Sequence, residues 1–169
     1  MFKILTGIAS YVVGGAKNVL EQSNQKFNEN DEEYAEKNYH LSLFLQTQRQ
    51  MMPTEGNKFI FKNDDQRRRY INFIFGAIDQ LSRTIKGEER RQIWAETSML
   101  AHATLTYPVD DALSACQVYG QTGNSELHTA GERGFNAMNT YILASVGRAS
   151  KEEFSRSSTE MYDVVSQYS

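Results

Sequence analysis

The sequence contains few of the features that constrain or interrupt a chain. Its single cysteine, Cys116, excludes an intramolecular disulfide, which favours a reducing compartment and leaves a secreted or periplasmic location as the alternative. Its two prolines leave room for long unbroken helices. No run reaches the roughly 18 to 20 apolar residues of a transmembrane helix, which argues against an integral membrane protein. We therefore expect a soluble, cytoplasmic chain.

Excess charge of one sign is also absent. The net charge is −3 and the isoelectric point is about 5.7, so no overall field attracts nucleic acid or anionic lipid. The densest basic clusters are Arg67–Arg69 and Arg90–Arg91, and an acidic pair directly precedes each of them. Such clusters are typical of solvated helix starts, so nucleic acid is not expected as a partner.

Apolar residues recur at steps of three and four along most of the chain, which predicts α-helices. We expect an all-α fold, a compact bundle of about six or seven helices without a substantial β-sheet, in one domain spanning 1–169. The only strand-like run is Phe59–Ile60–Phe61, which is too isolated to found a sheet. It is predicted to form an apolar loop or a hydrophobic staple of the helix that follows.

Capping signals agree with this spacing. They are Asn63 with Gln66 as its capping-box partner, Gly87 after the last turn of the same helix, Gly147 as a C-cap, and the capping box Ser150–Glu153. The last of these predicts a single helix that runs almost to residue 169.

The apolar stripes also predict which residues form the core. The predicted core residues are Ile71, Ile74, Ile78, Leu81, Trp94, Leu113, Met138 and Ile142, and Ala101 and Leu105 extend the face of Trp94. Gly131 and Gly134, three residues apart, predict a close approach of another helix and do not match a phosphate-binding loop.

The three histidines raise the hypothesis of a metal site. Glu36 and His40 are four residues apart, as are His128 and Glu132, so each pair shares one helix face. Two helices could bring these pairs together with His102 around an ion. However, the spacing matches no known metal motif, so neither a metal nor another cofactor is predicted.

Cys116 is the one candidate nucleophile, if His102 or His128 lies beside it as a base. It falls on the apolar side of its helix, where a free cysteine is usually a small core residue. Catalytic residues therefore remain unassigned, and an enzyme is the less favoured class.

Residues 1–22 form a predicted amphipathic helix that is semi-independent of the bundle, because the polar linker 23–30 separates the two. Its apolar face is a candidate interaction surface. That face consists of Phe2, Leu5, Ile8, Val12 and Val13. Packing on the bundle, a helix on a membrane surface and a cleaved signal peptide are the alternatives.

These observations favour a non-enzymatic helical interaction or regulatory protein that contacts a protein partner or itself, as a homo-oligomer. A helical-bundle enzyme, or a bundle that binds a small ligand or metal without a linear motif, is the first alternative. Peripheral membrane association through the N-terminal helix is the second.

Overall fold

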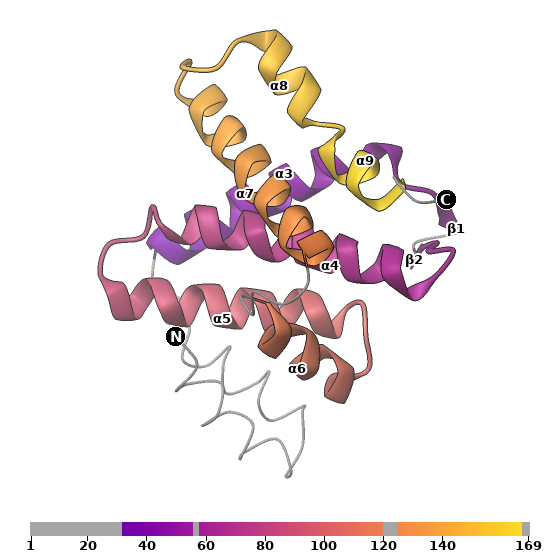
Figure 1. Cartoon of the computed structure of the whole chain (residues 1–169). Helices are drawn as coiled ribbons and strands as arrows, with labels where there is room; N and C mark the ends of the chain where they lie inside the picture. Colours follow the sequence, from indigo (N-terminus) through magenta and orange to yellow (C-terminus); the bar gives the residue numbers. More distant parts are fainter. Residues whose placement is uncertain (1–31, 56–57, 120–124, 167–169) are drawn as a thin grey trace.

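The computed structural model describes residues 32–55, 58–119 and 125–166, and helices account for 79% of these residues (Figure 1). The elements are α3 (Glu32–Gln48), the 3-10 turn η1 (Arg49–Met51), β1 (Thr54–Glu55), β2 (Lys58–Phe59), α4 (Asp64–Ser82), α5 (Glu88–Thr104), α6 (Val109–Val118), α7 (Ser125–Ser145), α8 (Lys151–Ser157) and α9 (Glu160–Ser166). The predicted all-α bundle is confirmed. The predicted helix 1–22 and linker 23–30 lie outside the described residues.

The loop expected around Phe59 contains a short hairpin, in which β1 and β2 pair antiparallel. No further strand occurs in the described ranges. Phe59 and Phe61 both contact the ring of Tyr70, with centroid distances of 5.6 and 5.1 Å. These contacts anchor the hairpin to the start of α4.

Helix α4 is the centre of the bundle, and every residue from Arg69 to Ile78 is buried. Helices α3, α5, α7 and α9 all pack against it. The predicted stripe of Ile71, Ile74, Ile78 and Leu81 is buried as expected. Phe73, Phe75 and Ala77 are buried as well, on the sides that the stripe leaves out. A helix that is apolar on nearly all sides needs neighbours all around it, which explains its central position.

Glycines bring α4 and α7 into backbone contact. A Cβ atom on Gly134 would lie 1.9 Å from the carbonyl oxygen of Phe73, and one on Gly76 would lie 1.8 Å from that of Gly131. The close approach predicted from Gly131 and Gly134 is therefore confirmed. The matching glycine on α4, Gly76, was not predicted.

The predicted helix caps are mostly correct. Asn63 accepts a hydrogen bond from the Gln66 backbone N–H at 2.9 Å, but the Gln66 side chain accepts from Lys62 N–H and not from the cap residue. Ser150 and Glu153 form the complete predicted capping box. Gly147 adopts a φ of 70°, and the Arg148 and Gly147 N–H groups donate to carbonyls of α7 in a Schellman arrangement.

The boundary predicted at Gly87 is wrong. Helix α4 ends at Ser82, and Gly87, with a φ of 87°, caps the start of α5 instead. The intervening chain forms two further turns, because the N–H groups of Thr84 and Ile85 donate to carbonyls three residues back. Burial of Ile85 keeps this turn against the core.

The single C-terminal helix predicted after Ser150 is also wrong, because the chain forms α8 and α9 with a break between them. The buried side chain of Gln48 lies at this break. Its amide donates to the Ser157 carbonyl at 2.6 Å and accepts from the Met161 N–H at 3.2 Å. These two backbone groups are four residues apart and would bond to each other in a continuous helix, so the Gln48 amide interrupts the helix by inserting between them.

Most of the predicted core is buried, but four positions differ, and one of them, Ala101, is only partly buried. Leu113 and Ile142 are only partly buried against the core. Leu105 is 83% exposed, because it follows the last residue of α5 at the point where the chain turns away. Trp94 is fully buried, and its indole N–H donates to the Asn38 side chain at 3.0 Å, which ties α5 to α3.

Candidate functional site

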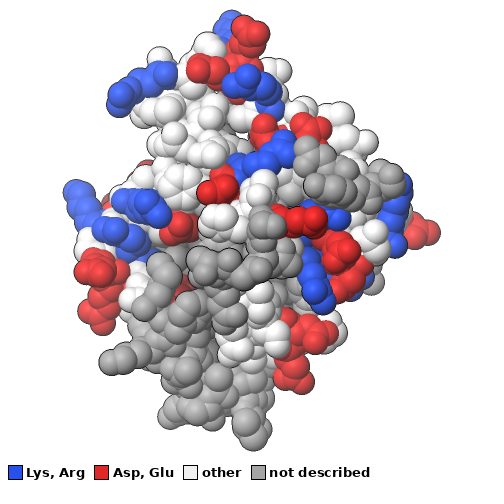
Figure 2. All heavy atoms as spheres, in the orientation of Figure 1, with Lys and Arg blue, Asp and Glu red and all other residues white. Residues whose placement is uncertain are grey.

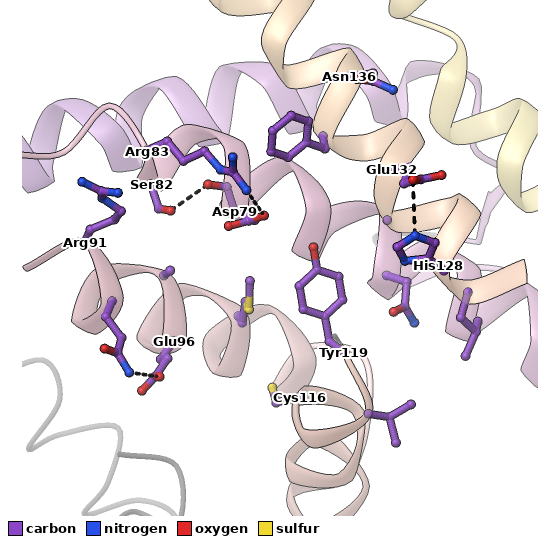
Figure 3. Close-up of a pocket in the computed structure, with 18 of the residues that line it drawn as sticks. Asp79, Ser82, Arg83, Arg91, Glu96, Cys116, Tyr119, His128, Glu132 and Asn136 are labelled. Atoms are coloured by element: carbon purple, nitrogen blue, oxygen red, sulfur yellow. Dashed lines mark hydrogen bonds and ion pairs between the residues drawn. The ribbon is translucent and has the colours of Figure 1, made fainter. Parts of the chain in front are cut away.

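A groove of about 770 Å³ lies between α5 and α7, with α4 behind it and the end of α6 beside it (Figure 3). Helix α5 lines it with one face, which consists of Glu88, Arg91, Gln92, Ala95, Glu96 and Met99. Helix α7 lines it with Leu127, His128, Gly131, Glu132, Phe135 and Asn136. Both sets repeat at helical spacing, so two helices present one face each to the same space.

Both apolar and charged side chains line this groove. Ala95, Met99, Leu127 and Phe135 provide apolar surface from both walls. Charged groups interrupt this apolar surface at several points, and four polar or charged side chains form two close pairs. The Arg83 side chain lies 3.3 Å from the Asp79 carboxylate, and His128 Nε2 lies 3.3 Å from the Glu132 carboxylate.

Two buried polar atoms in the groove lack a hydrogen-bond partner in the described part of the chain: Arg91 Nε and Glu96 Oε2. The other carboxylate oxygen of Glu96 accepts from the Gln92 amide at 2.9 Å. Burial raises the pKa of Glu96, and the Gln92 hydrogen bond only partly opposes this shift. A raised pKa together with its position in the groove makes Glu96 a candidate ligand-binding residue.

Cys116 also lines the groove, and its environment disfavours the thiolate. Burial raises the pKa of the thiol to about 12, and the negative charge of Glu96 acts in the same direction. An activated nucleophile needs the opposite shift. Neither His102 nor His128 hydrogen-bonds to it among the described residues. The interpretation of Cys116 as a core residue is confirmed by its burial.

The structure keeps the three histidines apart. His40 lies 3.7 Å from Glu36 on α3, His128 pairs with Glu132 on α7, and the ring Nδ1 of His102 bonds to the Ser98 carbonyl within α5. In the ranges that the structure describes, no three residues of metal-ligand type are grouped. Of the five metal candidates, only His128 and Glu132 line the groove.

The basic clusters are largely paired with acidic side chains. Arg67 and Arg68 lie 3.5 and 3.0 Å from Asp64, and Arg90 lies 3.1 Å from Glu33. Figure 2 shows basic and acidic atoms intermixed over the described part of one face. This face therefore presents no broad basic surface of the kind that binds a phosphate backbone.

The groove residues of α5 were not predicted. The predicted core face of this helix contains Trp94, which is fully buried, whereas the neighbouring face lines the groove. Glu88, Arg91, Ala95 and Met99 are spaced at three, four and four residues, and the small Ala95 and the flexible Met99 lie at its centre. That spacing was visible in the sequence, but only the position of α7 shows that the face borders a groove. The predicted interaction residues Phe2, Leu5, Ile8, Val12 and Val13 lie outside the described residues.

No family model, curated protein or solved structure matches this chain. Among the described helices, none is long and apolar enough to cross a membrane.

Proposed function

We propose that this protein is a non-enzymatic helical interaction module that binds an amphipathic helix of a protein partner in the groove between α5 and α7. The observation that carries the proposal is the composition of the two walls. Apolar side chains, Met99 and Ala95 from α5 and Phe135 and Leu127 from α7, face a space that charged groups border. A helix with one apolar face binds such a surface by placing residues at three- and four-residue steps into it.

The chemistry of the groove supports binding more than catalysis. Its cysteine is held as the thiol, and its one histidine forms an ion-pair contact on its own helix with Glu132. Methionine and aromatic side chains suit a surface that adapts to a partner helix.

The test is a photo-crosslinking amino acid at Met99 in the groove, in the full chain in its native cells. We expect an adduct with a specific protein, attached within an amphipathic helix of that protein. The control is the same substitution at Met51, which is 53% exposed on η1 and does not line the groove. The same adducts from both sites, or none from Met99, would contradict the proposal.

A matched pair of substitutions on α5 sharpens this test. Ala95→Arg places a long charged side chain in the groove, whereas Ala101→Arg changes another partly buried alanine of α5 that does not line it. Loss of the adduct is expected for the first variant only.

A small polar ligand is the second candidate for the groove. It is favoured by Arg91 Nε and Glu96 Oε2, two buried polar atoms that a ligand could pair. A molecule that copurifies with the wild-type protein in native mass spectrometry, and is lost in Glu96→Gln, would favour this candidate.

A further inference from the structure

We propose that residues 2–20 of the same chain dock in the groove as an amphipathic helix and thereby compete with the protein partner. The inference rests on the proposed function, because it uses the groove as a helix-binding site. According to this inference, a segment of the chain itself occupies the groove in the absence of a partner. The chain then inhibits its own binding of the partner.

The described chain begins beside one end of the groove. The Glu33 carboxylate, in the first turn of α3, accepts a hydrogen bond from the Lys86 N–H at 3.2 Å and pairs with Arg90 at 3.1 Å. Glu88 and Arg91, in the same first turns of α5, line the groove. The segment that precedes Glu32 is therefore tethered where the groove starts.

The lengths of the segment and the groove agree. An extended linker 23–30 reaches up to about 26 Å. A helix over residues 2–20 is about 28 Å long, and α5, with its 17 residues, is about 25 Å long. The linker can thus reach either end of α5, and the helix covers the length of this wall.

Charge and apolar surface are complementary. Four carboxylates and two guanidinium groups are among the described residues that line the groove: Asp79, Glu88, Glu96 and Glu132, and Arg83 and Arg91. Residues 2–20 contain Lys3 and Lys17 and no acidic residue. In a helix both lysines lie beside the same edge of the apolar face of the segment, where they can meet the carboxylates that line the groove.

Because the segment is tethered to the bundle, it binds the groove in preference to a free partner helix. A short flexible linker gives an attached ligand an effective concentration of about millimolar, far above that of a typical partner in a cell. A partner helix must therefore displace the segment, and weakening the segment opens the groove.

The experiment uses methionine methyl NMR on the full chain, because Met99 lines the groove while Met138 and Met161 are fully buried elsewhere in the core. The variant Ile8→Asp/Val12→Asp places two charges on the apolar face of the segment. We expect the Met99 signal to shift, and the Met138 and Met161 signals to stay in place as evidence of a preserved fold.

The matched control is Tyr11→Asp/Asn18→Asp, which adds the same charge on the side of the helix away from both the apolar face and the lysines and should leave Met99 unchanged. A free peptide of residues 2–20, added to the Ile8→Asp/Val12→Asp variant, should return the Met99 signal toward its wild-type position. In cells, the same variant should raise the yield of partner adduct from the groove photo-crosslinker by about tenfold or more.

An unchanged Met99 signal in Ile8→Asp/Val12→Asp overturns the inference. If partner adducts still form at the groove, the proposed function stands without it, and if adducts are also absent, both fail. A wild-type Met99 signal that moves to the variant position on dilution would show docking into a second copy, which also overturns it. So would binding of the wild-type chain to phosphatidylserine vesicles with the Met99 signal unchanged, because the segment would then lie on the membrane and not in the groove.

Discussion

Replacing Gly134 with alanine tests the backbone contact between α4 and α7. In an ordinary helix interior this change stabilises a protein by about 1 kcal/mol, since alanine has the higher helix propensity. Here the new Cβ would lie 1.9 Å from the Phe73 carbonyl oxygen, and distances under 3.0 Å are essentially never found. The clashing atom belongs to the backbone and cannot rotate away, so the two helices must separate by more than about 1 Å.

That separation would loosen the packing around α4, the most buried helix. Overpacking of a well-packed core costs about 1 to 3 kcal/mol and occasionally more. Because many side chains of α4 and α7 would lose contact at once, we expect Gly134→Ala to lower the free energy of unfolding by about 3 to 5 kcal/mol.

The matched control is Gly131→Ala on the same helix. Its Cβ would meet the side-chain Cε2 of Tyr119 at 3.2 Å, and a side chain can move by the few tenths of an ångström required. We expect a change within about 1 kcal/mol. Urea unfolding followed by the fluorescence of Trp94, the only tryptophan, measures both variants. Equal stability of the two would refute the backbone contact.

Three further predictions concern single side chains. Gln48→Glu should lower the free energy of unfolding by about 2 to 4 kcal/mol at neutral pH, as measured by urea unfolding. The reason is that a carboxylate cannot donate to the Ser157 carbonyl, which lies 2.6 Å from the present amide. The control Gln46→Glu, on the exposed side of α3, should change little. Burial lowers the pKa of His102 below its ordinary 6.5, so the unfolded chain takes up the proton at a higher pH than the folded chain. The free energy of unfolding should therefore fall as the pH drops through about 6.5. A His102→Gln variant with the same pH profile would contradict this. With a pKa of about 12, Cys116 should react with a neutral thiol reagent at pH 8 at least about a hundredfold more slowly than a free cysteine, and equal rates would contradict its burial.

Local signals in the sequence predicted the helices well because capping and spacing act within a few residues. Asn63, Ser150 with Glu153, and Gly147 perform the predicted roles at helix ends. The wrong prediction of a single C-terminal helix has a distant cause. Gln48 interrupts the C-terminal helix from 109 residues away along the chain, and no local pattern near Ser157 reveals that contact.

The groove was less predictable than the helices that build it. The spacing of Glu88, Arg91, Ala95 and Met99 defines a second face of α5, but spacing alone does not tell a groove wall from a solvated face. The histidine pairs illustrate the same limit, because their i, i+4 spacing was correct and yet they lie on separate parts of the bundle.

The sequence by itself therefore determined the all-α class, most of the helix caps and the glycines of α7 that allow close approach, since each depends on propensity and on neighbours along one helix. The tertiary structure alone decided that α4 is surrounded on all sides, that Gly76 meets Gly131, and that the faces of α5 and α7 border one groove. These features depend on which helix faces meet, and that is set by the packing of the whole bundle around α4.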